Sequence, residues 1–265
     1  MENTTSNEQL KRNRNLLILL MVIALAAAAL FWVCIQAFHL QGLPLYFTQL
    51  GLYLVFIGLA LWGLRREHIL LPVNLRLAGQ ALLITLIAWG VFALVVQLTG
   101  LASLKKEFSA LQNVPAWKIA LQILSTWFFV GMGEELLFRG YFLNAFHAHF
   151  ASGSGRRRWT NAVLLCSAFF SLWHLPARLA ELFTGGLDWA MLLLSLAVLF
   201  LLGAAFAFLY LRSGNLLLVG LVHGVMDYPL IGKDTQLSFI LLLAAIACVE
   251  IARWAAKKRS CASAE

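Results

Sequence analysis

The sequence alternates between long apolar runs and short polar segments. Eight runs predict membrane spans, at residues 16–38, 43–64, 77–101, 116–142, 160–183, 189–211, 215–230 and 236–254. An α-helix rises 1.5 Å per residue, so about 20 apolar residues cross the ~30 Å hydrocarbon core of a bilayer. The pattern therefore predicts an all-α fold, a polytopic membrane helical bundle of about eight transmembrane helices.

The polar segments divide the chain into four expected parts. Residues 1–15 are polar and expected to be a disordered cytoplasmic N-terminus, and residues 16–112 hold the first three spans followed by a short amphipathic segment. Residues 113–232 form the expected functional core, and residues 233–265 form the last span with a basic C-terminal tail. A signal peptide is the alternative for the first run, but its apolar region covers only about 7–15 residues, so we expect an uncleaved helix.

Composition agrees with a membrane location. The chain is 62% hydrophobic and 12% charged, against about 25% charged residues in globular proteins. Its net charge of +8 comes from short clusters between apolar runs, which argues against a nucleic-acid-binding face. The four cysteines are scattered, without zinc-finger or CxxC spacing, and imply no disulfide framework.

Loop charges predict the orientation, because cytoplasmic loops are enriched in Lys and Arg. In an eight-span arrangement the cytoplasmic segments hold Lys11, Arg12, Arg14, Arg65, Arg66, Arg76, Arg156, Arg157, Arg158, Arg212, Arg253, Lys257, Lys258 and Arg259. The opposite segments hold only Lys105, Lys106, Lys118 and Lys233. The loop charges therefore predict that both termini lie in the cytoplasm. We expect the membrane to be a bacterial plasma membrane.

Three ionisable residues interrupt the fourth apolar run: Glu134, Glu135 and Arg139. Each costs roughly 2.5 to 3.5 kcal/mol near the middle of a membrane helix, so partners are required. In an α-helix Glu135 and Arg139 share a face and can form an ion pair, whereas Glu134 points about 100° away. This spacing leaves Glu134 for a general base, and the alternative is that all three form a packing ion network.

Two later runs supply candidate partners for Glu134. His174 lies mid-membrane in the fifth run, just before Pro176, and a lone histidine there is more often a packing residue than a ligand. In the seventh run His223 and Asp227 are four residues apart on one helix face, a spacing that can hold one metal or one reacting atom. Gly220 and Gly224 predict close approach of another helix beside His223.

Several weaker candidates have simpler explanations. Arg178 is expected to pair with Glu181 at the membrane interface, and His147 and His149 are expected to be solvated or interfacial. The serine-rich turn at 152–155 lies in a basic loop, so it is not a nucleophile site. HExxH and GxGD motifs are absent from the sequence, which argues against a zincin and an aspartyl intramembrane protease.

Three motifs in this order carry a family resemblance: EExxxR at 134–139, FxxxH at 170–174 and HxxxD at 223–227. Over residues 113–232 the chain resembles the CAAX-protease and bacteriocin-processing family (CPBP, Abi-type) of intramembrane endopeptidases. The resemblance implies a polar cavity in which Glu134 activates water with help from His174, and Glu135 with Arg139 braces the site. It also implies that His223 and Asp227 bind a metal or stabilise the oxyanion.

The identity of residue 227 helps to distinguish oxyanion stabilisation from metal ligation. Family members can carry asparagine at this position, whereas this chain carries aspartate. An ionised aspartate cannot donate a hydrogen bond to an oxyanion. Asp227 therefore favours orientation of His223 or ligation of a divalent metal such as zinc by His174, His223 and Asp227. The alternative is an Asp227 that stays protonated in a low-dielectric site and can then donate.

The expected activity is cleavage of a membrane-anchored or lipidated peptide, with membrane lipid around the protein and no nucleic acid as partner. Two other classes of function are compatible with the same residues. One is a proton-coupled transporter that uses them as a relay. The other is a non-enzymatic immunity or scaffold protein.

Overall fold

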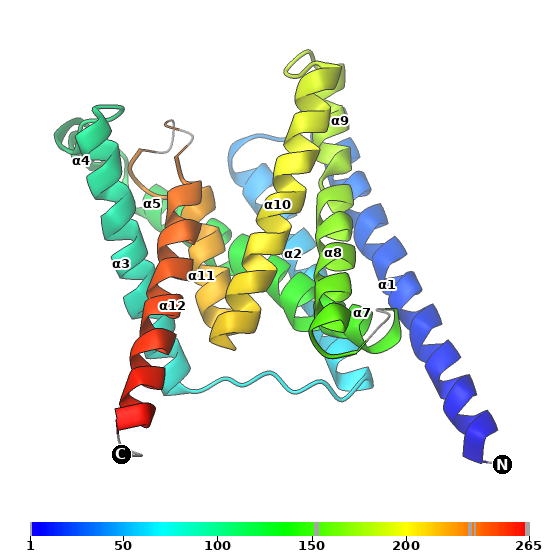
Figure 1. Cartoon of the computed structure of the whole chain (residues 1–265). Helices are drawn as coiled ribbons and strands as arrows, with labels where there is room; N and C mark the ends of the chain where they lie inside the picture. Colours follow the sequence, from blue (N-terminus) through cyan, green and yellow to red (C-terminus); the bar gives the residue numbers. More distant parts are fainter. Residues whose placement is uncertain (1, 151–153, 233–234, 236, 263–265) are drawn as a thin grey trace. The chain divides into compact units, whose positions relative to one another are not determined.

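The part of the chain that the structure describes folds into helices joined by short turns and loops. The structure is a computed structural model that describes residues 2–150, 154–232, 235 and 237–262, and these residues form no strand (Figure 1). The helices are α1 (Glu2–Phe38), α2 (Gly42–Arg66), α3 (Leu75–Thr99), α4 (Leu104–Gln112), α5 (Ala116–Ile123), η1 (Leu124–Gly131), α6 (Met132–Glu135), η2 (Leu136–Phe142), α7 (Leu143–His149), α8 (Gly155–Trp173), α9 (Leu175–Phe183), α10 (Trp189–Ser213), α11 (Leu216–Asp227) and α12 (Phe239–Ala262). The predicted all-α class is confirmed.

The long apolar helices confirm a polytopic membrane bundle. Among the described residues, 6 helical stretches are long and apolar enough to cross a membrane, at Asn13–Phe38, Gly42–Arg66, Leu75–Thr99, Gly155–Phe183, Trp189–Ser213 and Phe239–Ser260. The fourth and seventh predicted spans are not in this set. Residues 116–149 form five successive helical segments, and α11 has 12 residues, about 18 Å of helix. The count of eight stays a prediction.

The two ends of the chain differ from the sequence prediction. Residues 2–15, expected to be disordered, are helical, because α1 begins at Glu2. Adding residues to an existing helix is much easier than nucleating one, so even a polar stretch with several Asn, Thr and Ser residues can continue the membrane helix. At the other end α12 continues to Ala262 and carries the basic tail on a helix. Residues 152, 153, 233, 236 and 263–265 lie outside the described residues.

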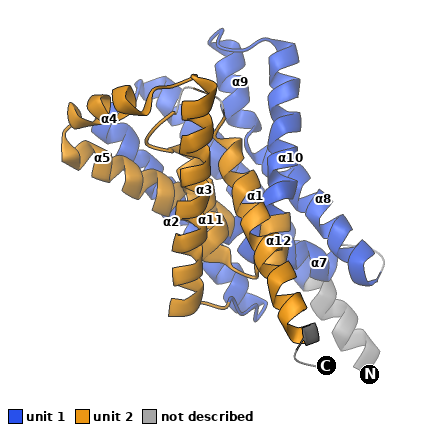
Figure 2. Ribbon diagram, turned by 60° about the vertical axis from the view of Figure 1, so that its left-hand side comes forward, with its two compact units in different colours: residues 1–71, 136–207 blue, residues 72–135, 208–265 orange. Residues whose placement is uncertain are grey.

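The chain divides into two compact units, coloured separately in Figure 2. Unit 1 comprises Met1–Leu71 and Leu136–Ala207, and unit 2 comprises Pro72–Glu135 and Phe208–Glu265. The division between Glu135 and Leu136 falls inside the core expected at 113–232. Sequence order does not reveal such units, because packing joins helices that are far apart in the chain.

Unit 1 has an aromatic core built from η2 and α8. The ring of Phe138 lies 5.0 Å from that of Phe170 and 5.6 Å from that of Trp173. The fully buried Arg139 lies within this core, with its guanidinium carbon 4.6 Å from the centre of the Phe170 ring. Its Nη2 donates to the carbonyl oxygen of Gly203 at 2.9 Å. Aromatic faces and a carbonyl therefore stabilise a charge that costs several kcal/mol to bury alone.

Unit 1 also holds a buried polar cluster that the sequence did not indicate. His149 Nε2 lies 2.6 Å from Glu67 Oε2, and the Tyr141 hydroxyl donates to Glu67 Oε1 at 2.9 Å. The His149 side chain is only 7% exposed, so the expectation that it is solvated or interfacial is wrong. The reason is tertiary, since the glutamate that removes it from water is 82 residues away in the chain.

Unit 2 is held together by close contact between α11 and the segments η1 and α6. A Cβ at Gly131 would lie 2.6 Å from the amide nitrogen of Gly224, and one at Gly224 would lie 2.9 Å from the Thr126 carbonyl oxygen. A Cβ at Gly220 would overlap Met132. These distances confirm the close helix approach predicted from Gly220 and Gly224, and they identify the approaching helix as the one that carries Glu134 and Glu135.

Two indole groups form hydrogen bonds with backbone carbonyls just after the C-terminal end of α11. Trp127 Nε1 donates to the Tyr228 carbonyl oxygen at 2.9 Å, and Trp89 Nε1 donates to the Pro229 carbonyl oxygen at 2.7 Å. A helix end with a proline exposes backbone carbonyls, which at membrane depth must be satisfied by protein or by a wet cavity. The two tryptophans satisfy these carbonyls and thereby fix the end of the helix that carries Asp227.

Candidate active site

The carboxylate pair lies on a helix whose hydrogen-bond pattern changes along its length. Both η1 and η2 are π-helical, and the four-residue segment Met132–Glu135 between them is α-helical. π-Helical turns are rare and frequently mark functional sites. Because Arg139 lies in η2, the α-helical spacing assumed for Glu135 and Arg139 does not apply. The two residues belong to different units, and their ion pair stays a prediction.

Four of the six predicted site residues lie together in unit 2: Glu134, Glu135, His223 and Asp227. Glu135 Oε1 lies 2.7 Å from His223 Nδ1, which is hydrogen-bonding distance. On the other side of the ring, His223 Nε2 lies 3.8 Å from Glu134 Oε2 and 3.5 Å from Asp227 Oδ2. One imidazole therefore contacts a carboxylate at each nitrogen.

The exposure of these side chains gives the cluster a closed end and an open end. Glu135 is fully buried, and the Glu134 and His223 side chains are 4% and 5% exposed, whereas the Asp227 side chain is 36% exposed. Charged groups removed from water require paired or hydrogen-bonded partners, and here each carboxylate has the same imidazole as neighbour. Asp227 is therefore the member of the cluster that is most open to its surroundings.

Local sequence features hold the four residues in this arrangement. Asn215 caps α11, since its Oδ1 accepts from the Leu218 amide at 3.2 Å and its Nδ2 donates to the Leu77 carbonyl oxygen at 2.8 Å. The cap fixes the start of α11 against α3, and the glycine contacts fix its face against η1 and α6. His223 then faces the carboxylate pair because it lies between Gly220 and Gly224 on the contacting helix.

His174 lies in unit 1, at the break between α8 and α9. Its Nδ1 is 2.8 Å from the Phe170 carbonyl oxygen, and its ring lies 4.6 Å from that of Phe170. A carbonyl accepts only, so Nδ1 carries the proton and Nε2 is the basic nitrogen of the neutral ring. Pro176 stands in the first turn of α9, directly after this break. The role of His174 stays a prediction from the resemblance.

The predicted metal ligands do not form one group in either unit. His223 and Asp227 lie in unit 2 and His174 in unit 1. Within residues 2–150, 154–232, 235 and 237–262, no three His, Cys, Asp or Glu side chains are placed to hold a metal ion together. Ligation of one divalent metal by His174, His223 and Asp227 therefore stays a prediction.

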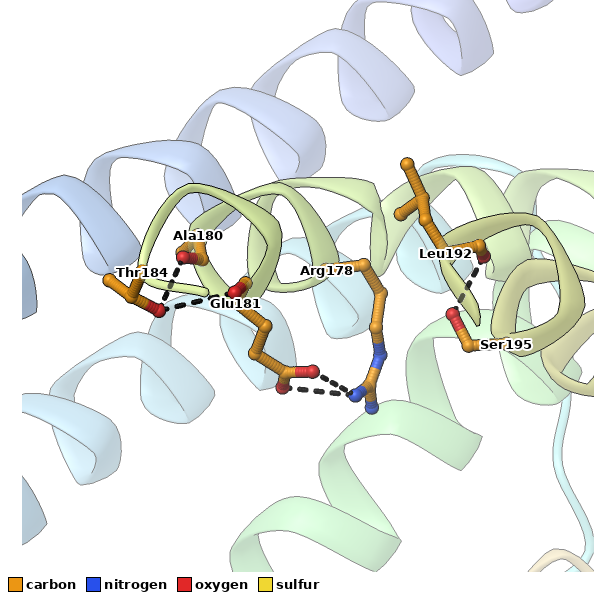
Figure 3. Close-up of polar contacts among 6 residues, drawn as sticks. All are labelled: Arg178, Ala180, Glu181, Thr184, Leu192 and Ser195. Carbon is orange, nitrogen blue, oxygen red and sulfur yellow. Dashed lines mark hydrogen bonds and ion pairs between the residues drawn. The ribbon is translucent and has the colours of Figure 1, made fainter. Parts of the chain in front are cut away.

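Arg178 and Glu181, the weaker candidates of α9, form the expected pair (Figure 3). Arg178 Nη1 lies 2.9 and 2.7 Å from the two Glu181 carboxylate oxygens, and the side chains are 30% and 38% exposed. In Figure 3 the arginine and glutamate point toward each other from one side of their helix. The pair is a local i,i+3 contact that neutralises both charges.

Sequence reasoning missed three residues that shape the site. Gly131 provides the surface on which α11 packs, and Trp127 and Trp89 bond to the carbonyls after Asp227. The sequence could have indicated Gly131, because two glycines, Gly131 and Gly133, stand directly before the glutamates and small residues favour close helix packing. The sequence could not have indicated the two tryptophans, because a tryptophan in an apolar run can face either lipid or protein.

The fold and the site together define a class: a polytopic α-helical membrane protein with a buried cluster of carboxylates around an imidazole. Residues 116–229 match a protein-family model described as type II CAAX prenyl endopeptidase Rce1-like. That segment contains all the predicted site residues, so the family resemblance of the three motifs is confirmed. Neither the curated proteins nor the solved structures gave a significant match. The family match supports an intramembrane protease as the general activity.

Proposed function

We propose that the protein is an intramembrane endopeptidase in which Glu134 activates water for attack on a peptide bond. The observation that carries this proposal is the buried set of Glu134, His223 and Glu135 within the segment that matches the endopeptidase family. Buried carboxylates beside an imidazole are what general acid–base hydrolysis requires, and burial excludes competing bulk water.

The division of roles follows from the two sides of the His223 ring. Glu135 accepts the Nδ1–H and orients the imidazole, so Nε2 points to the space shared with Glu134 and Asp227. Glu134 takes a proton from water, and the oxygen bonds to the carbonyl carbon of the substrate. When His223 carries both protons, its Nε2–H donates to the oxyanion. Glu134 then returns the proton to the leaving amine as the C–N bond breaks.

The substrate class follows from the membrane setting and from the name of the matched family. A buried site inside a helical bundle is reached from the lipid phase by a peptide that is itself anchored there. We propose a lipidated or membrane-anchored peptide as substrate, and a prenylated C-terminal peptide is the first form to test. Asp227, the most exposed member of the cluster, is placed to meet the substrate first.

The test is cleavage of a quenched fluorescent peptide by the purified full chain in detergent or nanodiscs. Peptides with and without a farnesyl group are compared for wild type, Glu134→Gln and His223→Ala. Loss of general-base catalysis lowers kcat by about 10²- to 10⁴-fold. Glu181→Gln is the matched control, because it makes the same change in a half-exposed pair of α9 and should leave kcat unchanged. Full cleavage by Glu134→Gln would refute the mechanism, and solute uptake without cleavage would favour a transporter.

The divalent metal remains a separate proposal, with its own readout. Metal content of the purified protein is measured beside Asp227→Ala and His174→Ala. If a metal is bound through these side chains, each substitution lowers the metal-to-protein ratio as well as the cleavage rate. An unchanged ratio in both variants would argue against ligation by these residues, whatever happens to activity.

A further inference from the structure

An open groove of about 620 Å³ lies in unit 2, away from the carboxylate cluster. Its walls come from α3 and α12, and its end comes from the junction between α10 and α11. The two long helices pack together in this unit, side by side in both ribbon views (Figures 1 and 2). The volume falls within the range of about 300–1,000 Å³ typical of ligand sites. None of the residues assigned to the proposed active site lines it.

The walls of the groove are apolar and face outward. Leu83 and Ile87 of α3 are 58% and 45% exposed, and Ile251 of α12 is 66% exposed. From Cys248 to Ala256 the groove follows α12 for about 12 Å. These helices are long and apolar enough to span a membrane, so the groove opens where hydrocarbon chains surround the protein.

One end of the groove is polar and carries excess positive charge. Arg212 and Arg253 both line that end, together with Asn215. Glu250 binds Arg212 through two contacts of 2.5 Å, so one carboxylate faces two guanidinium groups. Arg253 uses Nη1 for the Arg212 carbonyl oxygen at 2.7 Å. A guanidinium has five N–H donors, so Arg253 keeps donors for an anionic ligand.

We propose that this groove binds one anionic phospholipid, with an acyl chain along α3 and α12 and the phosphate at Arg253. Apolar walls that end at two guanidinium groups and one carboxylate match the two parts of such a molecule, and basic side chains at a helix end are typical of headgroup binding. An apolar helix from another protein would leave the arginine end unmatched. The proposal does not depend on the protease assignment.

The experiment is native mass spectrometry of the full chain released from detergent, with phosphatidylglycerol and phosphatidylcholine as probes. Wild type should retain phosphatidylglycerol in preference to phosphatidylcholine. Arg253→Gln should weaken phosphatidylglycerol binding about fivefold, the effect of about 1 kcal/mol for one basic residue at a membrane surface. Arg259→Gln removes the same charge from α12 outside the groove and should have no effect.

A second pair of variants tests the apolar part. Ala252→Trp fills the groove and should abolish retention of either lipid, whereas Ala247→Trp places the same side chain on α12 outside the lining and should retain phosphatidylglycerol. Cys248 gives an independent readout, because bound lipid should slow its maleimide labelling in a background without the other cysteines.

Four outcomes would overturn the proposal. One is equal loss of lipid in Arg259→Gln and Arg253→Gln, which indicates general charge attraction. Another is complete displacement by inorganic phosphate, which indicates a simple anion site. Displacement by the farnesylated peptide would make the groove a substrate site. Dimer formation that Ala252→Trp disrupts, without any retained lipid, would make it an interface between copies of the chain.

Discussion

Glu135 has a neighbour that helical spacing did not suggest. The sequence predicted a pair with Arg139, and the structure places Glu135 Oε1 2.7 Å from His223 Nδ1. A carboxylate at Nδ1 holds an imidazole in one orientation and one tautomer, as it does in many hydrolytic sites. Glu135 is therefore a positioning residue in the proposed mechanism, and Glu134 is the residue that meets water.

Replacing Glu135 by Gln tests this distinction. Because the side chain positions His223 and does not contact the reacting atoms, we expect kcat to fall about 10- to 100-fold with KM little changed. Steady-state cleavage kinetics measure both constants, and Glu135→Asp should recover part of the rate. A loss as large as that of Glu134→Gln, without recovery by Asp, would contradict a positioning role.

The stability contributed by a buried and by a half-exposed glutamate pair can be compared with one type of substitution, Glu to Gln, at Glu67 and at Glu181. Glu67→Gln weakens contacts to His149 and Tyr141 in unit 1, where the carboxylate is 4% exposed. Losing a buried charge-assisted hydrogen bond costs about 1.5–3 kcal/mol. Glu181→Gln removes a pair worth about 0–1 kcal/mol. Thermal melts should therefore show a clear decrease for Glu67→Gln and almost none for Glu181→Gln. Equal decreases would mean that the cluster of Glu67, Tyr141 and His149 adds no stability.

At the level of elements, glycines allow α11, which carries His223, to pack against the segment that carries Glu134 and Glu135. Gly131, Gly220 and Gly224 let the backbones of two helices approach so closely that a methyl group on any of them would overlap the other helix. Small residues at such contacts are typical of membrane helices, where apolar surfaces gain little by leaving lipid and close packing stabilises the pair instead. The glycines thereby set the distance between His223 and the two glutamates.

Gly131→Ala should separate these helices and lower both stability and activity. Its Cβ would meet backbone atoms of Gly220 and Gly224, which cannot move as a flexible side chain can, so we expect about 1–3 kcal/mol of destabilisation. Gly90→Ala on α3 is the matched control, because a Cβ there has no atom within 4 Å and alanine favours a helix. The measurement is thermal unfolding beside peptide cleavage. Equal behaviour of the two variants would show that the contact is not critical.

At the level of the whole molecule, the motifs at 134–139 and 223–227 lie outside the set of long apolar spans, whereas the motif at 170–174 lies within the span Gly155–Phe183. Residues 116–149 change between α and π forms, and α11 ends after 12 residues. The structure confirms an integral membrane bundle, whereas the crossing by residues 116–149 and the cytoplasmic location of both termini stay predictions. The two predictions depend on each other, because the loops before and after residues 116–149 were assigned to opposite sides of the membrane.

Cysteine labelling in intact cells tests this topology. In a background without native cysteines, Ser109→Cys and Ser154→Cys place exposed thiols before and after the segment 116–149. If the segment crosses the membrane, a membrane-impermeant maleimide labels Ser109→Cys from outside and reaches Ser154→Cys only after lysis. Ser260→Cys, near the C-terminus, should behave like Ser154→Cys. Labelling of both loops from the same side would show that the segment does not cross.

The sequence by itself determined the helical membrane class and indicated the residues of the proposed site, because both inferences follow from local properties. A run of about 20 apolar residues can only be a helix in lipid, and a charged side chain within it is too costly to lack a function or a partner. Only the tertiary structure decided which partner each charge has. It placed His223 beside Glu135, and it buried His149 against Glu67. It also divided the chain within one helix, between Glu135 and Leu136. Such pairings depend on how closely two backbones approach and on residues more than 80 positions apart in the chain. The spacing of residues within one helix predicts neither.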